Sequence, residues 1–384
     1  MNSFVTRKKN IFKRRLGLTQ KTLKNNRLDR NFQAMFRPFS IVLFVSCWVR
    51  YNIQDSCITP NGIKTIIQSV VGVISLIILT ISYMYESYTN PSLFWIVNFT
   101  LNTNHIFYLC GYIILIAINI KMRELDVLLV LKINRVYNYF KFNLNNMIIS
   151  NWIYVLVYCF YSIMYYTYSY LYIIPGVFKG YDVIYYSLIS NFDLNIIYAI
   201  CVMKLMRKCI EMWRKQIKLW NINDNFYVRN EEAHVNKMFE CYVDVIEVLF
   251  YTTESSIHGL LHIGLSIYVR KYILMDYFMV HIIVGLILWL GKNLLLQTIL
   301  GIECEKFYSA NEDAMAAYKT QMKCFTSVIE KQVCKNICRL NRAGLQKMSI
   351  YGMFQLDATL PFKLISFIAT YTIVILQFAL TKHL

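Results

Sequence analysis

Apolar residues in this chain come in blocks of about twenty, the length that an α-helix needs to cross the hydrocarbon of a bilayer. Within a block they lack the strict alternation of a barrel strand, so the pattern predicts helices. A helix also pairs its own backbone amides, which have no water to bind in lipid. We predict seven spans, at Lys64–Tyr85, Leu93–Ile120, Met147–Ile173, Asp182–Met203, Leu249–Val269, Leu274–Leu300 and Leu360–Leu380.

Shorter patterned segments lie outside these spans. Phe39–Asn52 is apolar but too short to cross, so we expect a helix at the membrane surface or packed within the bundle. Arg123–Phe142 alternates apolar and charged positions with helical spacing, and Phe239–Phe250 and Val328–Met348 do the same. These segments predict amphipathic helices that continue from the spans and form a cytoplasmic anchor region.

Lysine and arginine concentrate on one side of the predicted spans. The chain has 40 of them against 22 acidic residues, a net charge of +18, and 33 of the 40 fall in residues 1–63, 121–146, 204–248 and 301–359. Cytoplasmic loops retain basic residues, so we predict the amino terminus inside and the carboxy terminus outside. The charge then reflects topology and attraction to anionic lipid, and no nucleic-acid partner is expected. Three basic residues remain inside spans: Lys64, Lys292 and Lys363.

The last predicted span carries a narrow polar stripe. Helical spacing places Thr370, Val374, Gln377 and Thr381 on one face, with aromatic residues beside them. Polar groups inside a membrane line water and ion pathways or join neighbouring helices. From these residues alone, both interpretations stand.

The nine residues from Thr370-Tyr371 to Gln377-Phe378 resemble the TYhhhhhQF signature in the last span of insect gustatory receptors. Upstream, residues 352–357 (Gly-Met-Phe-Gln-Leu-Asp) resemble the G-x-F-x-x-D segment of that family. The resemblance implies a cation channel, a homotetramer or a heterotetramer with related subunits, in the plasma membrane of sensory neurons and opened by a small-molecule tastant. Thr372 stands where sugar-sensing members tend to have Glu, which favours a bitter-type or orphan receptor.

The resemblance also implies roles for single residues. Gln377 and Phe378 would form the constriction of a pore lined by the last span of each subunit, together with Val374 and Thr381. A phenylalanine ring can dewet such a pore, and an amide can replace part of the hydration of an ion. Thr370 and Tyr371 would support the pore helix nearer the cytoplasm.

A ligand entering from outside would meet aromatic walls and a few polar groups in the outer half of the bundle. The tyrosines there also suit the membrane–water boundary. A charge inside a span is costly, so we expect Asp193 to face a cavity or to be paired or neutral. Its two candidate roles are binding of a basic tastant and a structural bond. His262 follows His258 by one turn, which indicates buried hydrogen bonds rather than a metal site, because a third ligand is missing. The pocket candidates are Tyr166, Tyr170, Tyr185, Asp193, His262 and Trp289.

The sequence therefore predicts an all-α membrane protein with one integral domain over residues 1–384. It divides into a cytoplasmic region 1–63, six spans with anchor helices over 64–359, and a pore-lining span in 360–384. HExxH, GxSxG and P-loop motifs do not occur, so neither an enzyme nor a cofactor is expected. The alternatives are an odorant-receptor-like channel of the same superfamily, a G-protein-coupled receptor, which would need the amino terminus outside, and a transporter.

Overall fold

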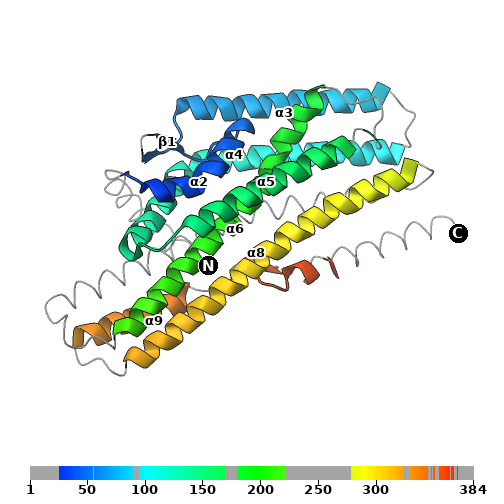
Figure 1. Cartoon of the computed structure of the whole chain (residues 1–384). Helices are drawn as coiled ribbons and strands as arrows, with labels where there is room; N and C mark the ends of the chain where they lie inside the picture. The colour runs from blue at the N-terminus through cyan, green and yellow to red at the C-terminus, as the bar shows by residue number, and fades with distance from the viewer. Residues whose placement is uncertain are drawn as a thin grey trace, which may run out of the picture.

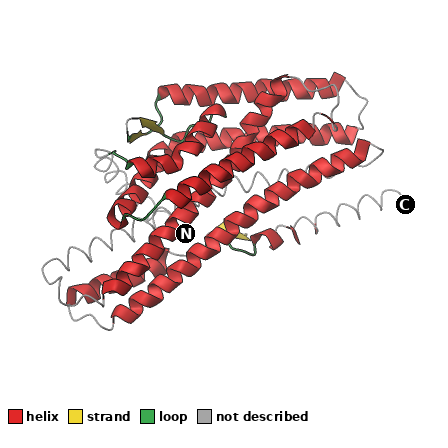
Figure 2. Cartoon of the chain, in the orientation of Figure 1, coloured by secondary structure: helices red, strands yellow, loops and turns green. Residues whose placement is uncertain are grey.

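The described part of the chain, in this computed structural model, is almost entirely helical (Figure 2). It comprises residues 26–54, 56–89, 95–168, 171, 180–220, 278–322, 328–344, 347, 349–350, 354–363, 365–366 and 370. The helices are α2 (Arg30–Val45), α3 (Ile63–Thr89), α4 (Trp95–Phe140), α5 (Asn145–Tyr168), α6 (Gly180–Trp220), α8 (Phe278–Met322) and α9 (Val328–Gly344). Two antiparallel hairpins join β1 (Asn52–Gln54) to β2 (Cys57–Thr59), and β3 (Ser349–Ile350) to β4 (Phe354–Gln355).

Four described helices contain stretches that are long and apolar enough to cross a membrane. These stretches are Ile63–Tyr85, Asn145–Tyr168, Asp182–Lys218 and Ile287–Thr320, and a shorter apolar stretch, His105–Lys121, lies in α4. The four long stretches overlap the predicted first, third, fourth and sixth spans, and the shorter stretch overlaps the second. Asp182–Lys218 and Ile287–Thr320 end well beyond the predicted Met203 and Leu300. The prediction of a helical membrane bundle is therefore confirmed, while Leu249–Val269 and most of Leu360–Leu380 lie outside the described residues.

Helix boundaries follow local capping chemistry. The Asp29 carboxylate accepts a hydrogen bond from the Asn31 amide (2.9 Å), which starts α2 before Phe39, where the apolar pattern begins. Lys141 has a φ of 44°, the left-handed conformation that ends many helices, and it follows α4 directly. Asn143 Oδ1 then accepts from the Asn145 amide (2.8 Å) and caps α5.

Helix α6 lies at the centre of the bundle, and α3 and α5 lie at its edge. Residues 191–203 of α6 are buried without interruption. In contrast, α3 and α5 each expose a row of large aliphatic and aromatic side chains, as lipid-facing helices do. The exposed rows include Ile67, Ile74, Ile78 and Ile81 on α3, and Ile153, Leu156, Phe160 and Ile163 on α5.

The amino-terminal helix packs inside the bundle rather than at its surface. Helix α2 buries Phe32, Met35, Phe36 and Phe39 in the common core. After Val45 the chain leaves the helix, so the expected helix over Phe39–Asn52 begins and ends earlier in the sequence. The loop that follows lies between α3, α4 and α6.

Polar side chains satisfy the backbone of this buried loop. The Asn191 amide donates to the Ser46 carbonyl (2.8 Å), and the Asn119 amide donates to the Val49 carbonyl (2.9 Å). Buried carbonyl groups need such partners, because an unpaired one costs about 1–3 kcal/mol. The asparagines of α4 and α6 thus fix the loop that carries Arg50.

Arg50 joins the loop to α4 and α6. Its Nε and Nη2 donate to Asn195 Oδ1 at 3.1 and 2.5 Å, and its guanidinium lies 4.4 Å from the centre of the Tyr198 ring. Its Nη1 lies 3.9 Å from Asp126 Oδ1. Burial raises the pKa of the Asp126 carboxyl, and the positive charge of Arg50 opposes that rise.

Replacing Arg50 by Met is expected to lower the free energy of unfolding by about 3 kcal/mol, because Asp126 and Asn195 lose their buried partner. Arg50→Lys should recover only part, since lysine lacks the planar fork. The melting temperature of the purified protein in detergent measures both changes. Lys121→Met, on an exposed position of α4, is the matched control and should leave it unchanged. An Arg50→Met protein that melts with the wild type would contradict the role of this network.

Helices α6 and α8 continue together beyond the predicted spans, which end at Met203 and Leu300, with α9 beside the carboxy-terminal end of α8 (Figure 1). Arg207 pairs with Glu303 at 3.3 Å and Arg214 with Asp313 at 2.8 Å, an order that makes the two helices parallel. The predicted helix over Arg123–Phe142 is the last part of α4, which ends at Phe140, and the one over Val328–Met348 is α9, which ends at Gly344. Phe239–Phe250 lies outside the described residues.

Candidate functional site

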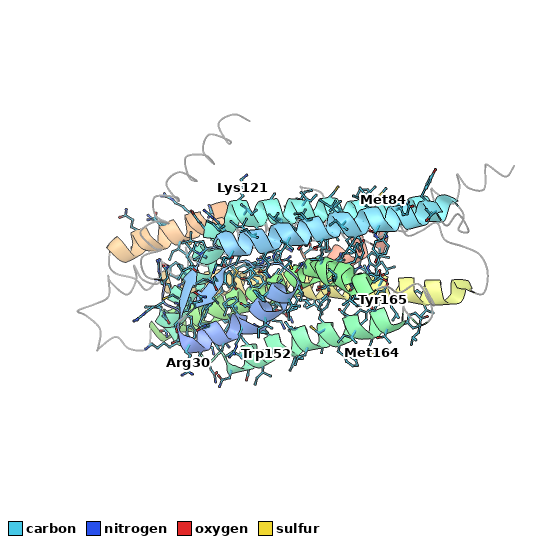
Figure 3. The ribbon with its side chains drawn as sticks, turned by 90° about the horizontal axis from the view of Figure 1, so that it is seen from above. Arg30, Met84, Lys121, Trp152, Met164 and Tyr165 are labelled. Carbon is cyan, nitrogen blue, oxygen red and sulfur yellow. The ribbon has the colours of Figure 1, made fainter. Side chains whose placement is uncertain are left out.

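Tyrosines of α5 and α6 form an aromatic cluster at one end of the bundle. The Tyr166 and Tyr186 rings stack with centroids 4.5 Å apart, and Tyr185 meets Tyr186 edge-on at 5.6 Å. Figure 3 places the neighbouring Tyr165 at the same end as Met84 of α3, opposite Arg30. This is the end that the charge distribution assigns to the outside. Two pocket candidates, Tyr166 and Tyr185, therefore belong to one cluster.

Asp193 lies in a buried ion pair that joins three helices. Lys292 of α8 donates from Nζ to Asp193 Oδ2, and Tyr158 of α5 donates to the same oxygen at 3.0 Å. The side chains of Asp193 and Lys292 are only 10% and 17% exposed. The carboxylate thus has the structural bond that was one of its expected roles, and a basic ligand would have to compete with Lys292 for it.

Helix α8 contributes an aromatic side chain beside this pair. Trp289 is buried, and it precedes Lys292 by three positions, which puts both on the same side of the helix. Tyr161 of α5 donates to the Leu288 carbonyl at 2.8 Å and connects α5 to α8 at this level. Trp289 thus lies on the same side of α8 as Lys292, the ion-pair partner of Asp193. The two remaining pocket candidates, Tyr170 and His262, lie outside the described residues.

A second outer cluster contains a histidine that the sequence analysis did not select. The His105 ring of α4 stacks on the Tyr83 ring of α3, with centroids 4.8 Å apart and planes 2° apart. Its Nδ1 shares a hydrogen bond with the Tyr185 hydroxyl of α6. The Tyr83 hydroxyl donates to Asp182 at the start of α6. The sequence pattern that could have indicated this cluster is a single histidine, His105, inside an apolar span.

The entry to the last predicted span is fixed by a capping carboxylate. Asp357 Oδ1 accepts hydrogen bonds from the Thr359 amide (3.0 Å) and hydroxyl (2.5 Å), and lies 3.8 Å from Lys363 Nζ. Burial alone would raise the pKa of Asp357, but these hydrogen bonds and the charges of Lys363 and Lys347 hold it below its usual value. Asp357, the last residue of the G-x-F-x-x-D-like segment, is thus an N-cap.

Helix α8 touches this entry at a glycine. A Cβ added to Gly301 would lie 2.5 Å from the Asp357 carbonyl oxygen, so only glycine permits the contact. Leu356 and Leu360 are buried on either side of Asp357. The start of the last span is therefore set directly on α8.

The described part of the last span shows little of the predicted pore. Thr370 is exposed in the single chain and its hydroxyl donates to the Ser366 carbonyl at 2.9 Å. Phe362 is exposed as well, by 74%. The predicted pore and motif residues Tyr371, Val374, Gln377, Phe378 and Thr381 lie outside the described residues.

No group of three or more histidine, cysteine, aspartate or glutamate side chains suited to a metal ion occurs among the described residues. The other features of the site are ion pairs, hydrogen bonds and aromatic contacts. These can position a ligand or connect helices, and they present no nucleophile paired with a base.

Comparisons with known proteins relate the chain to others by fold alone. No family model matches the sequence, and no curated protein matches it. Among solved structures, the insect olfactory receptor OR5 from Machilis hrabei, determined in complex with eugenol, superposes with a TM-score of 0.54. The match covers 91% of this chain and 100% of that receptor, at 12% sequence identity. The chain therefore has the seven-transmembrane helical fold of an insect olfactory receptor.

Proposed function

We propose that this chain is an insect gustatory receptor that acts as a tastant-gated, non-selective cation channel. The fold shared with a ligand-binding receptor over 91% of the chain is the observation that carries the proposal. The motif from Thr370 to Phe378 supports the gustatory branch, and Thr372 favours a bitter-type or orphan ligand over sugar.

The ligand is a small molecule that binds in the outer half of the bundle. Tyr166 and Tyr185 supply aromatic faces from the cluster of α5 and α6, and Trp289 supplies one from α8. The Asp193–Lys292 pair offers charged groups at the same junction. A site of this kind suits an aromatic compound with a few polar atoms. Tyr170 and His262 complete the candidate set.

The pore is formed by the last span of each subunit in a homotetramer or a mixed tetramer at the plasma membrane of sensory neurons. Gln377 and Phe378 form the constriction, with Val374 and Thr381 along the same face. Phe362 and Ile365 are exposed in the single chain, as the lipid-facing rows of α3 and α5 are, so this surface is compatible with contact to lipid or to a neighbouring subunit.

Gln377→Ala and Phe378→Ala are each expected to change the cation current at least about threefold, because they alter the pore constriction. Cells expressing an amino-terminally tagged chain are stained with and without permeabilisation, then patch-clamped with eugenol, caffeine and quinine as probes. Ile163→Ala, on the exposed side of α5, is the control and should behave like the wild type. A tag visible on intact cells would refute the orientation, and unchanged currents in both variants would refute the pore assignment.

A second candidate is an odorant-receptor-like channel of the same superfamily. The fold match to an olfactory receptor in complex with eugenol favours it. The two candidates differ in the probes that open the channel. A response to eugenol with none to quinine or caffeine would favour the odorant branch.

A further inference from the structure

His105 occupies a position from which one proton can affect three helices. It belongs to α4, while its ring contacts belong to α3 and α6. The Tyr83 ring lies parallel to it at 4.8 Å, and the Tyr185 ring meets it at 5.1 Å and 68°. The Tyr185 hydroxyl, on a residue that is 2% exposed, bonds to Nδ1.

Titratable groups from both neighbouring helices face this ring. Tyr83 comes from α3, and Tyr185 and Asp182 come from α6. The Tyr83 hydroxyl donates a hydrogen bond to the Asp182 carboxylate. Asp182 is 8% exposed, so water screens its charge poorly. The cluster brings an imidazole, two phenols and one carboxylate together.

The hydrogen bond between His105 and Tyr185 depends on the charge of the imidazole. We assign to the neutral ring the tautomer with its proton on Nε2, in which Nδ1 accepts from the Tyr185 hydroxyl. A protonated ring has hydrogen on both nitrogens, so Nδ1 must donate and the Tyr185 oxygen must accept. An unperturbed imidazole changes state near pH 6.5, within the range that external fluids reach.

Reversal of this bond reaches the proposed ligand site through direct contacts. Once its oxygen accepts from His105, the Tyr185 hydroxyl must turn its proton to another partner. Tyr185 packs edge-on against Tyr186, and Tyr186 stacks on Tyr166. His105 is thus connected to Tyr166 by three successive ring contacts.

We propose that His105 is a proton-binding site through which external acid changes the response of the receptor. The change in response rests on the proposed function, whereas proton binding at His105 does not. Acidic compounds and acid itself would then act as modulators at a place separate from the Asp193–Lys292 pair.

The chemical part is tested on the purified full-length protein in detergent. The melting temperature of each protein is measured at pH 7.5 and at pH 5.5. The change between the two pH values in the wild type is expected to differ by about 2–4 °C from the change in His105→Gln. Tyr185→Phe removes the phenolic partner and should also alter the pH dependence, which keeps the test valid if His105→Gln does not fold. Ile163→Ala, on the exposed side of α5, is the control and should follow the wild type. Equal pH dependence in the wild type, His105→Gln and Tyr185→Phe overturns the proposal.

The functional part compares cation currents at the same two pH values. Basal and quinine-evoked currents of the wild type are expected to change at least about threefold between them, because the bond reverses as His105 gains its proton. His105→Gln should change less than about 1.5-fold. If the wild type carries no current, the proposed channel function fails and the melting experiment still decides the proton site. A current whose pH dependence survives in His105→Gln overturns the link to the response.

Discussion

Lys292→Met is expected to lower the free energy of unfolding by about 3–5 kcal/mol, because it leaves the Asp193 carboxylate buried without its cation. The tyrosine that also donates to that oxygen, Tyr158, can stabilise the charge only in part. The melting temperature in detergent is expected to fall by about 6–12 °C.

The control for this prediction is the double variant. Asp193→Asn together with Lys292→Met removes both charges and should recover most of the loss, since no unpaired ion remains. Lys215→Met, at an exposed position of α6, should leave the melting temperature unchanged. A Lys292→Met protein as stable as the wild type would mean that the pair contributes nothing to the bundle.

Gly301→Ala is expected to displace the start of the last span. The new Cβ would lie 2.5 Å from the Asp357 carbonyl oxygen and 3.3 Å from its carbon, both backbone atoms that cannot rotate away. Overpacking of this kind costs about 1–3 kcal/mol, which exceeds the gain of about 1 kcal/mol from replacing a helical glycine. We expect a lower melting temperature and a changed basal current in the same protein.

Gly291, ten residues earlier on α8, provides the comparison. Nothing lies within 4 Å of a Cβ added there, so Gly291→Ala should keep or raise stability by up to about 1 kcal/mol. The two variants share the helix and the chemical change, and they differ in what the methyl group meets. Equal effects at both positions would show that the contact with Asp357 has no influence.

The sequence was sufficient for the membrane helices that the structure describes, because burial in lipid requires long, continuous apolar runs. The described spans begin and end close to the predicted residues at Ile63–Tyr85 and Asp182. The continuation of α6 to Trp220 and of α8 to Met322 was not predicted from the apolar pattern. Charged residues mark the membrane boundary, yet they do not end a helix when a parallel neighbour supplies their partners.

The site was predictable by residue type but not by pairing. Asp193 was selected as a costly charge inside a span, and Lys292 was recognised only as a basic residue inside another. The two lie 99 residues apart, and no spacing rule connects positions on separate helices. His105 was missed for the same reason, since its partners come from α3 and α6. The arrangement of Tyr166 with Tyr186 likewise required the packing of α5 on α6.

Helix α8 has 45 residues without interruption. At 1.5 Å per residue its length is about 67 Å, so a tilt of about 5° around one end moves the other by about 6 Å. The helix therefore moves as one rigid rod. Two ion pairs join it to α6, one at Lys292 and one at Glu303. A tilt that is too small to break any contact among the outer tyrosines therefore moves the carboxy-terminal end of α8 by about 6 Å, which is more than the pitch of one helical turn.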